Sequence, residues 1–534
     1  MFKSGCLKYV LIVIAVCSAA LCVSCSGGKE GRAGKGTLIV GEMSNYEGLN
    51  PMSTTDAHAR DIYEQMFLSL LDENDDFMTF EPRLATSYEF SEDRRQLTFK
   101  LREDVYWSDG VKFTSRDVVE TFWAQKDPAT GWSSRHLKEH IDSVEATGDY
   151  EVVYHFSKVY PYQVMDTRDG PILPAHIIKD IPHEELGNVP VERFPITGPF
   201  MIEQWEKGQK LVLKANPRYY DDDIPRLSRV IFKIIPDQVT LVTQLRHGEV
   251  DCMEAVPEDQ IDNIMRDNPE LKIFDFLGRG YNYIGWNGAV DPFGSVRVRR
   301  ALTMAIDRKK IIETAKYGYA EECVSPFIPL IWAYNPDIEP LPYDPERALE
   351  LLKAEGFSDT DGDGFLDRGG ERFEFELLTN HGSQVRADIQ VMVQEMLRKV
   401  GIKVNPVQLE WTVMLDKHKS SDFEAIITAW RTGTKADLAP IWSCDARKEG
   451  GYNRVDYCNA TMDSLNELAT STLDFDEARP LFHRAQEIIY EEQPYTFLYF
   501  SHTIFVLNKE FGGAEPDAIS CFHNLHEWYR KDQN

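Results

Sequence analysis

The chain has 534 residues, more than a single hydrophobic core usually serves, so we expect two or three domains. Hydrophobic residues make up 43% of the chain and charged residues 27%, which is typical of a folded protein and excludes a mainly disordered one. The formal charge of −29 gives a surface that repels phosphate backbones, which argues against nucleic acid as a partner.

The N-terminus predicts export. Residues 1–24 are predicted to be a signal peptide, in which two lysines precede an apolar run over 9–23 that is too short for a membrane-spanning helix of about 20 residues. The end of this run resembles a bacterial lipobox, in which Cys25 accepts a lipid, and the glycine-rich residues 25–36 then act as a tether. We expect a protein lipid-anchored to a membrane in the periplasm or at the cell surface. The alternatives are a plain secreted protein and an uncleaved anchor.

Export permits disulfide bonds among the remaining cysteines. Cys444 and Cys458 enclose a short glycine-containing loop and are the best candidate pair. The alternative is that both are separate buried thiols. Because five cysteines follow the tether, at least one of them stays unpaired.

The first half of the chain shows short strands and helices in alternation. Residues 37–40 predict an apolar strand, and a helix carrying Ile62 and Phe67 follows. Alternating polar and apolar residues over 88–101 predict antiparallel strands, and residues 152–156 another strand. Thr114 is placed to cap a helix together with an acidic residue three positions later.

The second half has a clearer α/β pattern. A strand over 373–377, a helix with apolar residues at helical spacing over 389–400 and a strand over 402–409 predict two parallel strands joined by a helix. Asp344 and the proline after it predict the start of another helix. Mixed sheets flanked by helices, in more than one lobe, are therefore the expected architecture.

Four sequence blocks form a recognisable series. They are DVYWSDGVKFTSRD at 104–117, TGPF with a following tryptophan and NPRYY over 197–220, IIPD with LRHGEVD over 234–251, and VRVRRAL with AIDR over 296–308. Together they resemble bacterial extracellular solute-binding protein family 5, whose members serve peptide and nickel importers. The blocks keep the family's order, and the resemblance extends over about residues 37–530.

The resemblance implies a two-lobed periplasmic-binding-protein fold of the Venus flytrap type, an α/β fold with mixed sheets and an extra inserted subdomain. Lobe I would hold residues 37–72, 191–288 and 498–534, the inserted subdomain residues 73–190, and lobe II residues 289–497.

The same resemblance implies how such a protein works. The chain would cross between the lobes at 285–289 and 497–501, and these crossings would act as a hinge. A short peptide or related small solute would bind between the lobes, the lobes would close on it, and an ABC permease in the membrane would receive it. No cofactor is required for this function.

Two tryptophans, Trp411 and Trp430, match a pair that lines the peptide pocket in relatives; the alternative is that both are core residues. Relatives place an acid that binds the peptide ammonium three residues after the second tryptophan, where this chain has Gly433. Asp437 is the expected substitute, while Lys435 stands where an acid is usual. This departure leaves open whether the solute is a peptide with a free N-terminus.

Three more residues are candidate ligand contacts. Arg431 could pair with a carboxylate of the solute, although a solvated surface arginine is the alternative. The loop with Asn45 and Tyr46 is expected to face the ligand from lobe I.

An acidic stretch in the second half has part of the pattern of a calcium-binding loop. Asp359, Asp361, Asp363 and Asp367 occupy positions 1, 3, 5 and 9 of an EF-hand-like segment, but the closing acid comes one residue late. A structural Ca²⁺ is one interpretation, and a polar turn without an ion is the other.

The alternative in the enzyme class is a zinc metallopeptidase, because His136, Glu139 and His140 fit the H-x-x-E-H pattern. No nucleophile elbow, phosphate-binding loop or dinucleotide fingerprint is present in the sequence, so we expect no enzyme. A third class is a surface sensing or interaction protein that has the same fold without a transporter.

Overall fold

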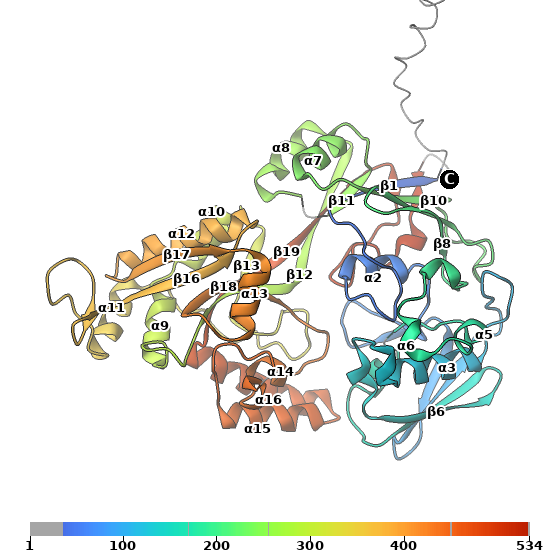
Figure 1. Cartoon of the computed structure of the whole chain (residues 1–534), viewed down its shortest axis with the longest axis horizontal. Helices are drawn as coiled ribbons and strands as arrows, with labels where there is room; N and C mark the ends of the chain where they lie inside the picture. Colours follow the sequence, from blue (N-terminus) through green and yellow to red (C-terminus); the bar gives the residue numbers. More distant parts are fainter. Residues whose placement is uncertain (1–35, 169, 255, 449–450, 532–534) are drawn as a thin grey trace, which may run out of the picture.

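The computed structural model describes residues 36–168, 170–254, 256–448 and 451–531 (Figure 1). The predicted signal peptide, the lipid-accepting Cys25 and the tether up to residue 35 lie outside this part. Within it, no helix is long and apolar enough to cross a membrane.

Two lobes stand side by side, joined by two long neighbouring strands (Figure 1). These strands are β12 (Leu271–Trp286) and β19 (Tyr495–Asn508), and they belong to one eleven-stranded mixed sheet that runs through both lobes. The strand order is β17-β16-β18-β12-β19-β11-β1-β10-β9-β8, with β13 paired to β19. The two-lobed α/β fold expected from the sequence is thus confirmed.

The crossing between the lobes lies earlier in β12 than the sequence predicts. Pairing of β12 with β19 is interrupted between Leu277 and Tyr281, and the lobe II strand β18 pairs with β12 only from Gly280 onward. The prediction of 285–289 is therefore wrong, because the strand continues through the lobe boundary instead of ending there. Gly278 lies in this interruption, where β12 approaches β19 closely. A Cβ on residue 278 would lie 2.9 Å from the Ser501 carbonyl oxygen, so a side chain there would collide with the backbone of β19.

The boundaries shift accordingly, and we define the parts by the structure. Lobe I comprises residues 36–72, 191–277 and 502–531, and lobe II comprises residues 279–500. Residues 281–286 and 497–500, which the sequence assigned to lobe I or to the hinge, pack in the lobe II cores.

Lobe I is built on strands that fit the predicted short apolar segments. The strand β1 lies between β10 and β11 and runs parallel to both, and antiparallel β9 and β8 complete this end of the sheet. The elements are β1 (Thr37–Glu42), α2 (Ala57–Tyr63), β2 (Leu71–Glu73), β8 (Phe200–Glu206), β9 (Lys210–Ala215), β10 (Arg229–Ile234), α7 (Gln238–Arg246), β11 (Cys252–Glu254), α8 (Ile261–Asp267), β20 (Phe511–Gly512) and β21 (Tyr529–Arg530).

The inserted subdomain, residues 73–190, has its own four-stranded antiparallel sheet in the order β4-β5-β7-β6. Thr114 and Asp117 form the predicted capping box at the start of α3. One continuous cluster of buried apolar side chains runs through lobe I and this subdomain, so the two move as one body. The elements are β3 (Phe80–Pro82), β4 (Ala85–Phe90), β5 (Gln96–Leu101), α3 (Ser115–Lys126), β6 (Ile141–Gly148), β7 (Glu151–Phe156), α4 (Gln163–Arg168), α5 (Ala175–Ile178) and α6 (His183–Leu186).

Lobe II contains the predicted strand–helix–strand unit, in which β16 and β17 pair in parallel. Its other helices cover the two faces of the sheet (Figure 1). The elements are α9 (Val296–Met304), α10 (Arg308–Ala315), β13 (Ala320–Glu322), α11 (Pro345–Ala354), β14 (Asp367–Arg368), β15 (Glu371–Arg372), β16 (Glu374–Asn380), α12 (Gln384–Arg398), β17 (Lys403–Leu409), α13 (Trp411–Lys419), β18 (Ala425–Arg431), α14 (Ala439–Trp442), α15 (Ala460–Ser471) and α16 (Phe475–Glu492).

Candidate functional site

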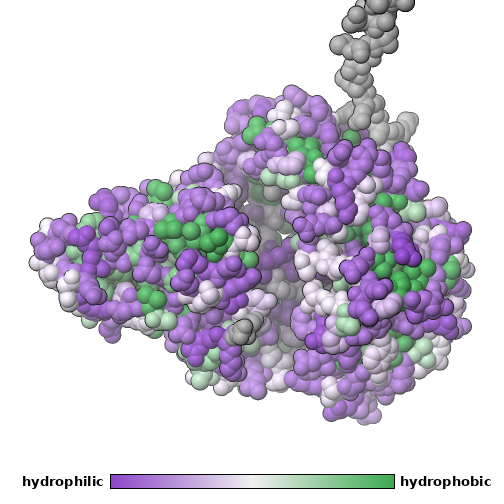
Figure 2. Space-filling model, viewed as in Figure 1, coloured by the Kyte–Doolittle hydropathy of each residue, from purple (hydrophilic) through white to green (hydrophobic). Residues whose placement is uncertain are grey.

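A groove separates the two lobes in the space-filling view (Figure 2). The carboxyl ends of β1 and β11 from lobe I and of β18 from lobe II lie near the crossing between the lobes. In α/β sheets, ligands commonly bind outside the carboxyl ends of strands. The base of this groove is therefore the candidate site.

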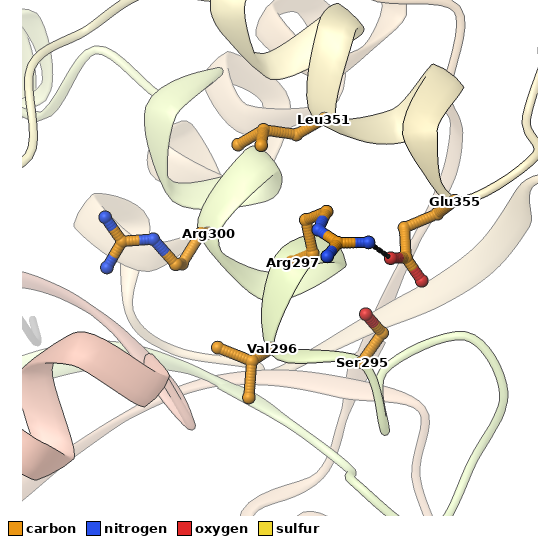
Figure 3. A pocket seen from close by; sticks show the side chains of 6 residues that line it. All are labelled: Ser295, Val296, Arg297, Arg300, Leu351 and Glu355. Atoms are coloured by element: carbon orange, nitrogen blue, oxygen red, sulfur yellow. Dashed lines mark hydrogen bonds and ion pairs between the residues drawn. The ribbon is translucent and has the colours of Figure 1, made fainter.

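A separate pocket of about 400 Å³ lies on the outside of lobe II, between α9 and α11 (Figure 3). Arg297 forms an ion pair there with Glu355, and Arg300 lines the pocket on the side away from that pair (Figure 3). The pocket is remote from the groove, so we assign it no part in the candidate site.

Trp430 is half-buried near the end of β18, opposite Tyr281 of β12, and so lies where the lobes meet. Its ring is nearly parallel to that of Tyr283, at an interplanar angle of 13°, and its indole N–H donates to Tyr495 Oη at 3.2 Å. Tyr283 and Tyr495 stack in turn with centroids 3.8 Å apart. Three rings therefore connect the core of lobe II to the groove, and they fix the plane of the Trp430 indole.

Two further rings surround Trp430. The imidazole of His418 lies 5.7 Å away, and burial lowers the pKa of His418 to about 4, so it is neutral at physiological pH. Tyr452 meets Trp430 edge to face at 5.9 Å and is 51% exposed. The aromatic wall thus ends in a solvent-accessible ring, suitable for an apolar part of a solute.

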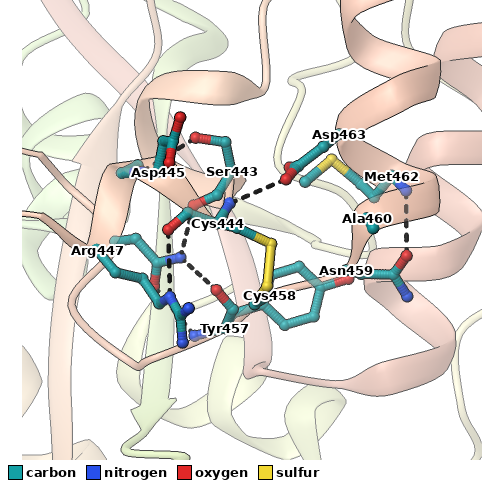
Figure 4. The surroundings of a disulfide bond; sticks show 12 residues. Ser443, Cys444, Asp445, Arg447, Tyr457, Cys458, Asn459, Ala460, Met462 and Asp463 are labelled. Atoms are coloured by element: carbon teal, nitrogen blue, oxygen red, sulfur yellow. Dashed lines mark hydrogen bonds between the residues drawn. A yellow bond between two sulfur atoms is a disulfide. The ribbon is translucent and has the colours of Figure 1, made fainter.

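The loop that carries Tyr452 is closed by a disulfide bond between Cys444 and Cys458, the pair expected from the sequence (Figure 4). The backbone N–H of Cys444 also donates to Asp463 Oδ2 at 3.2 Å, which ties the start of the loop to α15. The disulfide therefore restrains the position of Tyr452 against Trp430.

Replacing both Cys444 and Cys458 by serine should destabilise lobe II by about 3 kcal/mol, because the unfolded chain regains the entropy of a 14-residue loop. It should also weaken solute binding, since Tyr452 loses its restraint. Thermal unfolding and calorimetric titration measure the two effects. Replacing the buried, unpaired Cys252 by serine is the control, and equal changes in both proteins would contradict a role for the loop.

Trp411, the other predicted tryptophan, lies at the first position of α13 and is 49% exposed. It is therefore not a core residue. Asn45 is exposed, and its side-chain oxygen accepts a hydrogen bond from the Gly208 N–H at 2.8 Å. Tyr46 is only 1% exposed and packs edge to face on Phe232, so in this structure it is a core residue of lobe I and not a ligand contact.

Two arginines of lobe II lie at the base of the groove. Arg279 follows the crossing in β12, and burial together with repulsion from Arg431 lowers the pKa of Arg279 to about 10. Arg431 is exposed and forms no ion pair with any residue that the structure describes. An unpaired guanidinium beside a second one can bind a carboxylate through two parallel hydrogen bonds.

Lobe I presents carboxyl groups to the same region. Glu42 ends β1, and burial, strengthened by the nearby Glu254 and Asp61 charges, raises the pKa of Glu42 to about 8. Burial and the Glu64 charge raise the pKa of Asp61 to about 8 as well. The Arg431 charge has the opposite, smaller effect and lowers the pKa of Asp61. The groove therefore has carboxyl groups on the lobe I side, which hold their protons up to about pH 8, and guanidinium groups on the lobe II side. Sequence reasoning missed these acids because no motif connects them across more than 200 positions.

The raised pKa of Glu42 predicts a pH dependence of stability. In the unfolded chain a glutamate loses its proton near pH 4, whereas folded Glu42 keeps its proton up to about pH 8. The folded state then binds more protons between these values, so stability falls as pH rises through this window.

Glu42→Gln should remove this part of the dependence. The Tm of the variant minus the Tm of the wild type should increase between pH 5 and pH 8, by on the order of a few degrees. Scanning calorimetry across this range measures the difference. The exposed Glu47→Gln is the control, and Tm curves of Glu42→Gln and wild type that stay parallel would contradict the assignment.

Residues 432–438, which we call the strap, follow β18 and include the predicted Asp437. Asp437 is exposed, and its Oδ1 accepts hydrogen bonds from the Ala439 N–H and the Asn466 side chain, both at 2.9 Å. Lys435 points instead to the inserted subdomain, where it pairs with Asp166. Asp437 is therefore partly engaged in starting α14.

The sequence profile of the bacterial extracellular solute-binding proteins, family 5 (middle region), matches residues 79–451. This chain belongs to that family. The family consists of extracellular solute-binding proteins, which indicates a periplasmic or surface location for this family 5 protein.

Known relatives cover almost the whole family 5 chain. The oligopeptide-binding protein AppA of Bacillus subtilis is 33% identical over 540 residues, with 97% of each chain covered, and the dipeptide-binding protein of Escherichia coli is 26% identical over 556 residues, with 98% covered. Among solved structures, AppA in complex with a nonapeptide matches with a TM-score of 0.76 and 31% identity, covering 93% of this chain and 99% of AppA. NikZ of Campylobacter jejuni in complex with Ni(L-His) matches with a TM-score of 0.78 and 25% identity, covering 93% of this chain and all of NikZ.

The predicted zinc motif of the enzyme alternative does not form a helical pair in this family 5 protein. His136 is exposed in a four-residue 3-10 helix, and His140 follows after that helix ends and packs against Tyr160. Two imidazoles one α-helical turn apart, which the motif requires, are thus absent here. The relatives named above are binding proteins, in keeping with a protein that does no chemistry on its solute.

The acidic turn of lobe II brings three of its four predicted ligands together. Carboxylate oxygens of Asp359, Asp361 and Asp363 lie within 4.8 Å of one another, all exposed. Asp367 points elsewhere, because its oxygens accept hydrogen bonds from the N–H and hydroxyl of Thr360 at 2.7–2.9 Å. The turn thus offers a partial oxygen cage.

Proposed function

We propose that this chain is the substrate-binding lipoprotein of an ABC importer, which captures short peptides in the groove between its lobes and delivers them to a membrane permease. The observation that carries this proposal is that carboxyl groups of lobe I face guanidinium groups of lobe II at the base of the groove, and a bound ammonium would favour the ionised form of the carboxyl groups. Carboxyl groups around Asp61 lie on lobe I, and Arg279 and Arg431 lie on lobe II. A short peptide is a zwitterion that complements both.

The aromatic wall supports peptides over small ions. Trp430 and Tyr452 offer flat apolar surface beside the charged groups, and such surface accepts side chains of many shapes. The relatives that bind oligopeptides and dipeptides cover nearly the full chain. Arg431 would then hold a carboxylate of the peptide. An ammonium group would lie near Asp61, Asp437 or both.

The ammonium assignment has a direct test. Asp61→Asn and Asp437→Asn should each weaken binding of a peptide with a free N-terminus, but not binding of its N-acetylated form. Isothermal titration of each variant with the two forms of one peptide shows which of the two carboxylates contacts the ammonium. A variant that loses affinity equally for both forms would show that its carboxylate does not contact the ammonium.

The substrate class is tested by what the native protein carries. We expect mass spectrometry of small molecules, released by denaturing a freshly purified soluble form that begins near Gly28, to show a mixture of short peptides. A single compound that is not a peptide would overturn the peptide assignment and leave the binding-protein function standing.

The lipid anchor and the transporter are tested in cells. Cys25→Ser should abolish incorporation of a labelled fatty acid and release the protein from the membrane fraction. Uptake of the recovered peptides should stop when the gene for this chain is deleted. Uptake that continues unchanged would favour a sensing protein without a transporter.

No cofactor is required for this function, but we propose a structural Ca²⁺ at Asp359, Asp361 and Asp363. Millimolar Ca²⁺ should raise the Tm relative to EDTA, and Asp361→Asn should remove that difference. Differential scanning fluorimetry measures it, with Mg²⁺ as the control ion. Identical melting in Ca²⁺ and EDTA would mean that the turn is held by its own hydrogen bonds.

A further inference from the structure

The strap is held firmly by lobe II. At its start, the Thr432 N–H donates to the Arg279 carbonyl at 2.8 Å, which extends the pairing of β18 with β12. Further along, Ala436 and Leu438 are buried in a lobe II core, and the Leu438 N–H donates to Asn466 Oδ1 at 2.8 Å. The strap is therefore part of lobe II and presents Lys435 in a defined position.

Helix α4 of the inserted subdomain presents a matching carboxylate. The side chain of Asp166 is only 5% exposed. Its Oδ2 accepts a hydrogen bond from Tyr160 Oη at 2.8 Å, and its carbonyl accepts one from the buried Lys138 ammonium at 2.5 Å. Asp166 is thus fixed within the subdomain before lobe II approaches.

The strap meets Asp166 of α4 and Tyr162, the residue just before α4, across the groove. Lys435 Nζ forms an ion pair with Asp166 Oδ1, and the Lys435 ammonium lies 5.6 Å from the centre of the Tyr162 ring. Tyr162 Oη donates to the Ala436 carbonyl at 2.8 Å. Separating this pair would leave the almost fully buried Asp166 carboxylate without its partner, which is costly because water does not replace the lost interaction.

A second contact joins the same two bodies. Phe77, in the turn between β2 and β3, is 1% exposed because it packs in a lobe II core. The Arg279 guanidinium lies 5.4 Å from the centre of its ring. Phe77 has a φ of 53°, a left-handed conformation that a bulky residue adopts only when its surroundings hold it there. The Phe77 ring therefore stays buried only while lobe II packs against the inserted subdomain.

We propose that Lys435, Asp166, Tyr162 and Phe77 form a latch that holds the lobes together before a solute binds. Opening the lobes would separate Lys435 from Asp166 and expose the Phe77 ring to water. The closed form is thereby favoured by contacts that involve no ligand atom. The latch goes beyond the proposed function, because it concerns the two lobes whatever the solute is.

The test uses the mature protein after bound solute has been removed by reversible denaturation. In Lys435→Met, which keeps the apolar stem, the ratio of open to closed molecules should rise at least about tenfold. Small-angle X-ray scattering should show a larger radius of gyration, and hydrogen exchange should speed up in the peptide covering Tyr162 to Arg168. Lys448→Met is the matched control, because it removes a lysine–aspartate pair of lobe II with both side chains at least 75% exposed.

Two further variants make the result decisive. Asp166→Asn should produce the same opening, and the double variant with Lys435→Met should open no further than either single variant. Phe77→Ala should open the lobes independently and add to Lys435→Met. If Lys435→Met and Phe77→Ala scatter and exchange like the wild type, the latch is wrong. That outcome leaves the proposed function intact, since recovery of bound peptides is a separate measurement.

Discussion

Trp430→Ala should weaken binding of the peptides recovered from the native protein by roughly 30-fold or more. The substitution removes the flat surface between the core tyrosines and Tyr452, and leaves Tyr495 Oη without the indole N–H. Because Trp430 is half-buried and part of a ring stack, some loss of stability accompanies the loss of affinity. Isothermal titration with one recovered peptide, below the Tm of the variant, separates the two effects.

Trp430→Phe is the informative companion. It keeps an aromatic face beside Tyr283 but cannot donate to Tyr495, so its affinity should lie between those of wild type and Trp430→Ala. Trp123→Ala, on α3 of the inserted subdomain, is the control for removing an exposed tryptophan that is not a candidate ligand contact. Should Trp430→Ala bind as tightly as wild type, the aromatic wall is a core feature and the solute lies elsewhere in the groove.

Much of the fold could be predicted from local pattern. The helical spacing of residues 389–400 between two apolar strands gave α12 with β16 and β17, and Thr114 with Asp117 gave the start of α3. These predictions succeed because each depends on neighbours within one element. The helix expected around Ile62 ends at Tyr63, before Phe67, which packs in the core of lobe I instead.

The hinge and the charges of the groove could not be predicted in this way. The position of the crossing depends on where the pairing of β12 with β19 is interrupted and where β18 begins to pair with β12, and the residue pattern of β12 does not predict either point. Glu42 and Asp61 have unusual pKa values only because the fold buries them near other acids. The burial of Phe77 could not be predicted either, because Phe77 packs against lobe II residues that lie some 200 positions later in the sequence.

Arg299 shows how a sequence block can be recognised before its physical role is visible. It lies in the VRVRRAL segment, on α9, and is 7% exposed. Its guanidinium donates to four backbone carbonyls at 2.7–3.1 Å, those of Phe293, Gly294, Glu492 and Gln493. Two of these carbonyls belong to the C-terminal end of α16, where the last carbonyls of a helix have no partner within it.

Arg299→Met should therefore destabilise lobe II by about 3–5 kcal/mol, because it removes the donor from four buried or partly buried carbonyls at once. Thermal unfolding measures the loss, and hydrogen exchange should localise it to the C-terminal turns of α16. Arg299→Lys, with fewer donors and no planar fork, should recover only part of the stability. The neighbouring Arg300→Met is the control, since among the described residues Arg300 donates to a single carbonyl, that of Glu491, at 3.0 Å. Equal losses for Arg299→Met and Arg300→Met would mean that α16 is held by its apolar face and not by this arginine.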